Sequence, residues 1–465
     1  MVSGDELAGP RVQTTLVLSI SRDRERVERP PHDGRTNCRY PPPDGQPCRA
    51  SAPAEVLSLA PRGRPTSLGA SIDPRPRRGR HIGAIRYIHV EQPADAEALA
   101  EDLNRSRRIA LDCEAAGFHR YSDQLCLLQI STAAATYIVD PLTFDPSEVL
   151  RPPLEDPDVE IVMHGADFDL RLLKRDLDIR LRGLFDTQIA AALLGAEALG
   201  LAALLEGRFD VVLSKKYQRA DWAERPLTDG MLQYAAADTH HLFALADELK
   251  GEVEAAGRSH WVTEECRALE DAAFIELDDE EAPDPITRVK GARDLSARQV
   301  TALRLALEWR DEIARKRDKA LFRVVGDGPL IQAVAANPQS REELADIKGF
   351  PGGLARNQGR DLVRILRSVV DLPEDDLRPY PSRRRDGPGR PTPEVEALAD
   401  ALKAVRNARA DALGVARGTL LSNAVLLEVA RAAPTDVEAL HAIAGMRRWK
   451  ADAVGEELLG VIRKR

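Results

Sequence analysis

A short apolar run that leads directly into two acidic residues is the feature that most constrains the fold. Residues 109–111 read Ile-Ala-Leu, which is typical of a buried strand, and Asp112, Cys113 and Glu114 follow without a break. Side chains alternate along a strand, so Asp112 and Glu114 share one face, while Cys113 is expected to pack on the other as a small hydrophobe. Two acids at the end of a buried strand need partners, so other polar segments must meet them.

Two further segments carry acids with helical spacing. Tyr234 and Asp238 lie four residues apart in a strong helical pattern, so they share one helix face. A second amphipathic stretch begins near Asp169, with Asp167 as an alternative acid in the same segment. Hard divalent cations prefer oxygen ligands, and several carboxylates in one place either hold cations or raise one another's pKa. Metal-assisted chemistry on phosphate is therefore the leading hypothesis.

Strand-like and helix-like segments alternate through this region. The patterns predict helices beginning at Pro93, near Asp169 and after Asp186, and Asp186 is well placed to cap the helix that follows it. Strands are predicted at 86–91, 109–113, 125–131, 135–140 and 159–163. Strands with helices packed on the sheet indicate an α/β layered fold.

Length and composition set the remaining limits. A chain of 465 residues is too long for one ordinary core, and its formal net charge of −9 does not mark it as a general binder of polyanions. A nucleic-acid substrate would need a local basic track. The five cysteines form no C-x-x-C pair and no apolar run approaches the length of a membrane span, so we expect reduced thiols, a cytoplasmic location and no membrane partner.

The order and spacing of the acidic motifs resemble those of a known family. D-x-E at residues 112–114, the segment 164–169 and Y-x-x-x-D at residues 234–238 are similar to the three motifs of ribonuclease D, a 3′–5′ exonuclease of the DEDD superfamily, tyrosine branch. The stretch KKYQRADWAERPL, residues 215–227, also resembles the family. The resemblance implies a ribonuclease-H-like core.

The same resemblance implies the site residues and the cofactors. Counted from His164, Asp169 rather than Asp167 occupies the family position. The implied catalytic residues are Asp112, Glu114, Asp169, Tyr234 and Asp238, of which the four carboxylates would bind two divalent cations, Mg²⁺ or Mn²⁺. Because a phenol with a pKa of about 10 is a poor base, Tyr234 is expected to position the attacking water. We expect no small-molecule cofactor, and the histidines His164, His240 and His241 are expected to be structural or to support the site.

The C-terminal part is helical in pattern and resembles the HRDC module shared by helicases and ribonuclease D. Residues that fall at family positions include Trp309, Arg310, Arg315, Asp318 and Pro338, and a weaker repeat of the pattern follows. The predicted organisation is a disordered Pro/Arg-rich tail (1–83), an exonuclease domain (84–270), an acidic linker (271–289), an all-α HRDC domain (290–371), a Pro/Arg linker (372–392) and a second HRDC-like domain (393–465).

The predicted function is release of 5′-nucleotides from RNA 3′ ends, and the family implies precursors of tRNA or other structured RNAs as substrates. A DNA 3′–5′ exonuclease is one alternative, because the core fold does not read the 2′-hydroxyl. A catalytically silent nucleic-acid-binding scaffold is the other. Candidate nucleic-acid contacts are Gln129, Phe168, Arg310, Arg315, Lys316 and Lys319, although the cationic cluster fits an ordinary solvated helix face equally well.

Overall fold

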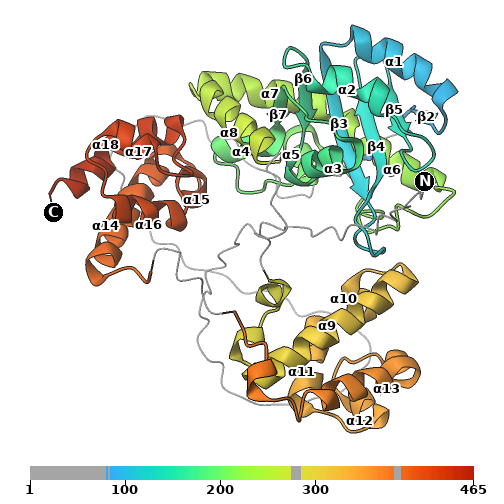
Figure 1. The fold of residues 1–465 in the computed structure, drawn as a ribbon. Helices are drawn as coiled ribbons and strands as arrows, with labels where there is room; N and C mark the ends of the chain where they lie inside the picture. Colours follow the sequence, from blue (N-terminus) through green and yellow to red (C-terminus); the bar gives the residue numbers. More distant parts are fainter. Residues whose placement is uncertain (1–79, 82–83, 274–283, 382–388, 465) are drawn as a thin grey trace, which may run out of the picture. The chain divides into compact units, whose positions relative to one another are not determined.

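The computed structural model describes residues 80–81, 84–273, 284–381 and 389–464 (Figure 1). The predicted disordered tail lies outside the described residues except for Arg80–His81, which form strand β1. β1 pairs in parallel with β8 (Val211–Val212) in a separate two-stranded sheet. These two residues, which the predicted tail includes, therefore have a strand partner for their backbone.

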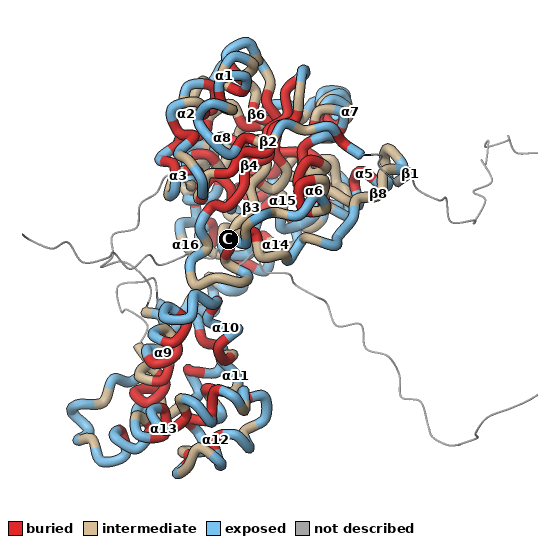
Figure 2. The backbone as a smooth tube through the Cα atoms, turned by 90° about the vertical axis from the view of Figure 1, so that its right-hand side faces the viewer, coloured by how far each residue is buried: buried red, intermediate tan, exposed pale blue. Residues whose placement is uncertain are grey.

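A mixed six-stranded sheet forms the centre of the first large part of the chain. The strand order is β2-β5-β4-β3-β6-β7, with β4 antiparallel to β3 and β5 and the other neighbours parallel. Figure 2 shows the burial of its central strands, and every residue of β4 is buried. The strands are β2 (Ile88–Val90), β3 (Arg108–Ala115), β4 (Leu125–Ser131), β5 (Thr136–Val139), β6 (Glu160–Met163) and β7 (Leu184–Asp186).

Helices cover both faces of this sheet, which confirms the predicted α/β class. Leu111 and Ile130 belong to the core cluster on the side of α1, α2 and α3, whereas Leu127 and Ile138 pack with Ala235 of α6 on the other side. This division follows from the alternation of side chains along each strand. The helices are η1 (Pro93–Asp95), α1 (Ala96–Arg105), α2 (Ser147–Glu155), α3 (Asp167–Leu177), α4 (Thr187–Leu193), α5 (Leu201–Phe209), α6 (Asp229–His240), α7 (Leu242–Ala255) and α8 (Ser259–Ala272).

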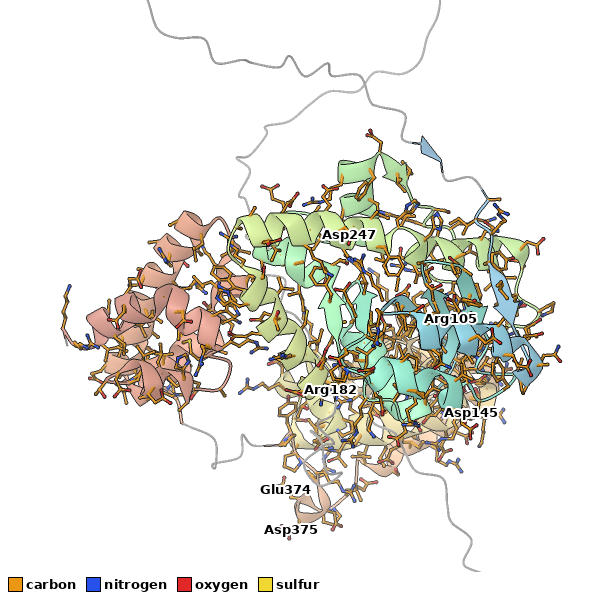
Figure 3. All side chains as sticks on the ribbon, turned by 90° about the horizontal axis from the view of Figure 1, so that it is seen from above. Arg105, Asp145, Arg182, Asp247, Glu374 and Asp375 are labelled. Atoms are coloured by element: carbon orange, nitrogen blue, oxygen red, sulfur yellow. The ribbon has the colours of Figure 1, made fainter. Side chains whose placement is uncertain are left out.

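Polar contacts attach α8 to the edge strand β7. The backbone N–H of Leu184 donates to the buried carboxylate of Glu270 at 2.9 Å. Arg182, labelled in Figure 3, donates to Glu270 at 3.2 Å and to Asp271 at 2.8 Å. The helix therefore satisfies backbone groups at an edge that would otherwise be open for pairing.

The C-terminal part consists of helices, as predicted. Ser296 and Gln299 form a reciprocal capping box at the start of α9, and Ile286, in a segment predicted as linker, is buried in the core of the same helical module. Its helices are η2 (Pro285–Arg288), η3 (Ala292–Asp294), α9 (Ala297–Arg317), α10 (Leu321–Val324), α11 (Asp327–Ala336), α12 (Arg341–Asp346), α13 (Gly352–Ser368) and η4 (Glu374–Asp376).

A second helical module repeats this layout. Its buried residues include Leu402, Leu426 and Leu458. Among the helices that the structure describes, none has the length and apolar character needed to cross a bilayer. The helices of the second module are α14 (Pro393–Leu413), α15 (Arg417–Leu420), α16 (Asn423–Ala432), α17 (Val437–His441) and α18 (Arg448–Ile462).

Candidate active site

Strand β3 presents Asp112 and Glu114 on the sheet face that α6 covers. Cys113 between them packs into the core on the opposite face, as predicted. The register of β3 with β4 shifts directly after Glu114, and such irregularities change the direction of a strand where side chains must be re-aimed. Burial raises the pKa of Asp112 to about 7 and the pKa of Glu114 well above its usual range.

Helix α3 supplies Asp169 from its first turn. Asp169 is 8% exposed, and burial together with the charge of Asp112 raises its pKa well above the ordinary value. Asp167 differs, because its carboxylate accepts from Arg171 at 2.8 Å in an ion pair on the same helix. The structure therefore brings Asp169, and not Asp167, next to the acids of β3.

The loop before α3 is held by Asp186 at the end of β7. The Asp186 carboxylate accepts from Gln188 and Ile189, which confirms the predicted cap of α4. It also accepts from the backbone N–H groups of Gly165 at 3.0 Å and Ala166 at 2.8 Å. One buried carboxylate thus fixes the start of α4 and the loop that carries Asp169.

Helix α6 supplies Tyr234 and Asp238 from one face. Burial, followed by the charges of Asp238, Glu114 and Asp112, raises the pKa of the Tyr234 phenol. Burial and the charge of Asp112 raise the pKa of Asp238 well above its ordinary value. The ring of Tyr234 packs beside that of the buried Trp222, with centroids 6.0 Å apart. Trp222 itself is part of the core on this side of the sheet.

Three hydrogen bonds hold α6 to the sheet and to the segment before β2 without involving Tyr234 or Asp238. Gln233 forms a reciprocal pair of hydrogen bonds with the backbone of Ile85, each 2.9 Å long. Near the other end of the helix, the hydroxyl of Thr239 shares a hydrogen bond with Ser131 at 2.8 Å. The helix position is therefore independent of the chemistry of its two site residues.

The four carboxylates, of which Asp169 is buried and the other three are half-buried, form one group that suits divalent cations. Each of Glu114, Asp169 and Asp238 has its pKa raised by the charge of Asp112 in addition to burial. Ionised acids so arranged repel one another, and oxygen donors of this kind are the ligands that Mg²⁺ and Mn²⁺ favour. The donor set therefore fits the divalent cations that the resemblance implies.

A different group in the described part has ligand atoms within 4.8 Å of one another: His89, Glu91 and Asp140. Asp140 is fully buried, and both of its oxygens accept from Arg225, at 2.6 and 2.8 Å. A carboxylate that is already paired with a guanidinium binds a metal cation weakly. The cluster around Asp112 is the better candidate.

Without divalent cations, the protein is expected to lose stability as the pH rises. The ordinary pKa of Asp112 is 3.8 and its folded-state pKa is about 7, so folding favours the protonated carboxyl. Its contribution is complete below about pH 4 and is lost as the pH rises through about 7, on the order of 4 kcal/mol. Urea unfolding in EDTA between pH 5 and pH 8 measures about 3 kcal/mol of this loss, because part of it occurs below pH 5. A free energy of unfolding that stays constant or rises over that range would contradict it.

The predicted nucleic-acid contacts divide into two groups. Lys316 and Lys319 are exposed, and Phe168 is 41% exposed, so all three are accessible. The prediction that Arg310 and Gln129 contact nucleic acid is wrong. Arg310 is buried, and its guanidinium donates to Val325 O and to Asp327, while Gln129 has no exposed surface. Neither side chain is accessible to a nucleic acid.

Arg315 belongs fully to neither group. It is exposed, but its guanidinium donates to Asp311 one turn earlier on α9 at 2.6 Å. Its charge is therefore partly compensated within the helix. The histidine prediction is consistent with His164, whose Nδ1 shares a hydrogen bond with Thr187 and whose pKa is lowered by burial.

A pocket of about 490 Å³ adjoins Tyr234 and Asp238, and the residues on its other walls were not predicted. Val212, Leu213 and Tyr217 line it together with Ile85. The stretch around Tyr217 resembles the family in sequence. Its spacing from the acidic motifs does not predict that it borders the same site.

The sheet, the order of its site residues and the helical modules that follow it in the sequence define a 3′–5′ exonuclease with HRDC domains. Residues 87–254 match the 3′–5′ exonuclease family model, and residues 300–366 and 395–462 match the HRDC domain. Ribonuclease D of Escherichia coli is 32% identical over 294 residues, covering 63% of this chain and 77% of that protein. Ribonuclease D of Granulibacter bethesdensis is 29% identical over 379 residues, covering 80% and 91%.

A solved structure agrees with these sequence relationships. The crystal structure of Escherichia coli RNase D has a TM-score of 0.60 and 26% identity, covering 82% of this chain and 99% of that one. The chain belongs to the ribonuclease D family. It is a 3′–5′ exoribonuclease, its fold implies use of divalent metal, and its substrate class is RNA.

Proposed function

We propose that Asp112, Glu114, Asp169 and Asp238 hold two divalent cations, Mg²⁺ or Mn²⁺, and that Tyr234 orients the attacking water. The observation that carries the proposal is a group of four buried or half-buried carboxylates from β3, α3 and α6, in which the charge of Asp112 raises the pKa of the other three. Such a cluster is unfavourable when ionised and empty, so its charge balance calls for cations.

The chemistry is hydrolysis of the terminal phosphodiester. Bound cations would stabilise the charge that develops on the attacking and leaving oxygens. The water oxygen forms a bond to phosphorus and gives up a proton to the solvent, while the bond between phosphorus and the 3′ oxygen of the preceding nucleotide breaks and that oxygen takes up a proton from the solvent. A 5′-nucleotide leaves, and the shortened RNA keeps a 3′-hydroxyl. With its pKa raised, the Tyr234 phenol stays protonated and can hold the water by hydrogen bonding without removing its proton.

We propose RNA 3′ ends in precursors of tRNA or other structured RNAs as the substrates. The relative of known structure is described as an exoribonuclease involved in structured RNA processing. Two HRDC domains that follow the nuclease in the sequence supply additional surface for a folded RNA. The exposed Lys316 and Lys319 on and next to α9 are the candidate phosphate contacts.

Release of 5′-nucleotides from RNA and DNA of one sequence tests this function. Each substrate is labelled at its 5′ end and incubated with Mn²⁺, with Mg²⁺ or with EDTA. Stepwise shortening of RNA that requires a divalent cation is the expected result. Equal or faster shortening of DNA would favour a DNA exonuclease, and binding without shortening under all conditions would favour a silent scaffold.

Replacing Lys316 and Lys319 with Gln is expected to weaken binding of a folded RNA with a 3′ overhang. Each lost phosphate contact should make the slope of log binding constant against log salt shallower by about 0.7. Fluorescence anisotropy over a salt series measures the slope. Arg364→Gln is a matched control, because Arg364 is exposed on α13 and already paired with Asp361 at 2.6 Å. An unchanged slope in the double variant would make Lys316 and Lys319 part of a solvated helix face.

A further inference from the structure

Gln129 is a fully buried amide beside the candidate metal centre. It lies in β4 and is the register partner of Asp112 in β3. Within the described part of the chain, neither its Oε1 nor its Nε2 has a hydrogen-bond partner. Residues directly opposite in an antiparallel pair project to the same face, with Cβ atoms about 4.5–5.5 Å apart. The amide therefore shares its side of the sheet with the Asp112 carboxylate.

Few of the residues around Gln129 can form a hydrogen bond with its amide. Ile138 of β5 is its partner on the other side and is apolar. Leu127, two residues earlier on the same face, packs with Ala235 of α6. Ser131, two residues later, bonds to Thr239 of α6. Gln129 thus lies beneath the turn of α6 that ends at Asp238, and across the strands its polar neighbour is Asp112.

A buried amide without a bond is costly, and a core position that needs only bulk can be filled by Leu or Met without that cost. Ser131 provides the contrast on the same strand and face. Its hydroxyl is bonded to Thr136 at 2.9 Å and to Thr239 at 2.8 Å. Ser131 therefore stabilises the fold. The hydrogen-bond partner of Gln129 must instead become available in the metal-bound, active state of the site.

We propose that Gln129 is a positioning residue for the metal centre: its Nε2 donates to the Asp112 oxygen that faces away from the cation and so fixes the carboxylate for binding. This inference rests on the proposed function, since it assumes that Asp112 is a metal ligand. Hydrogen bonds to ligating carboxylates orient them, and loss of such a bond typically lowers metal affinity about 10- to 100-fold.

Gln129→Met keeps the volume of the side chain and removes the amide. The thermal unfolding midpoint of the full chain is measured in EDTA and over a Mn²⁺ series, with hydrolysis of a short single-stranded RNA over the same series. The variant should be as stable as the wild type in EDTA, or more stable. It should need about 10- to 100-fold more Mn²⁺ for half of the maximal midpoint shift, and hydrolysis should recover at saturating Mn²⁺.

Ser131→Ala is the matched control, and it should lower the midpoint in EDTA with no change in the Mn²⁺ requirement. The inference is overturned if Gln129→Met lowers the midpoint in EDTA and keeps the wild-type Mn²⁺ requirement. If the wild type itself gains no stability from Mn²⁺, the proposed function fails instead. Should Gln129→Met not fold, a crystal structure of the wild type with Mn²⁺ decides: Nε2 of Gln129 lies within about 3.2 Å of an Asp112 oxygen, or the inference is wrong.

Discussion

Asp112→Asn is expected to abolish hydrolysis while the fold and RNA binding remain. The substitution keeps the volume of the side chain and removes one charge from the cluster. Loss of charge stabilisation worth several kcal/mol lowers the rate on the order of 1,000-fold. In EDTA at pH 8 the variant should be more stable than the wild type, because burial raises the pKa of Asp112 and disfavours its ionised form. Single-turnover release of nucleotide and urea unfolding measure the two effects.

Asp167→Asn is a suitable control for this experiment. Asp167 lies two residues before Asp169 on α3 but is paired with Arg171, outside the cluster. Its replacement should leave turnover within a few-fold of wild type, as for other exposed pairs. If Asp112→Asn retains more than a small residual of activity, Asp112 is not a metal ligand.

Tyr234→Phe is expected to lower turnover on the order of 100-fold with Mn²⁺ affinity little changed. The hydroxyl is proposed to orient water, and misplacement of a reacting group by about 1 Å can cost that much. The ring contact with Trp222 survives in Phe, so the helix should keep its place. The rate at saturating RNA and Mn²⁺, together with the Mn²⁺-dependent midpoint shift, separates the two roles.

Tyr137→Phe controls for loss of a tyrosine hydroxyl elsewhere. The Tyr137 hydroxyl donates to Asp102 at 3.1 Å. Its loss should reduce stability and leave turnover unchanged. An equal loss of Mn²⁺ affinity and turnover in Tyr234→Phe would mean that Tyr234 helps to hold the cations and does not act on the water.

The motifs and most of the sheet were predictable because they depend on local spacing. Alternation along β3 places Asp112 and Glu114 on one face, and four-residue spacing does the same for Tyr234 and Asp238 on α6. The cap by Asp186 follows from its position at the start of a helix. Each of these features involves neighbours in sequence, where physical rules are strongest.

Features that depend on tertiary packing were not predictable. Arg310 reads as a surface cation in a basic run, yet α9 turns it inward to Asp327. Gln129 is polar and was predicted to contact nucleic acid. It is buried because β4 has neighbouring strands on both sides and helices over both faces. The pocket wall formed by Val212 and Tyr217 depends on how a connection folds back over α6, which no periodicity encodes.

The attachment of α6 has a consequence for the evolution of this family. Gln233 and Thr239 hold the helix through bonds that do not use Tyr234 or Asp238. Selection on folding therefore places little constraint on the Asp238 carboxylate and on the Tyr234 hydroxyl, as distinct from the Tyr234 ring that packs beside Trp222, and only selection on activity maintains these two groups. A descendant with Phe in place of Tyr234 or Asn in place of Asp238 would keep the same architecture, and shared ancestry alone would no longer indicate an active enzyme.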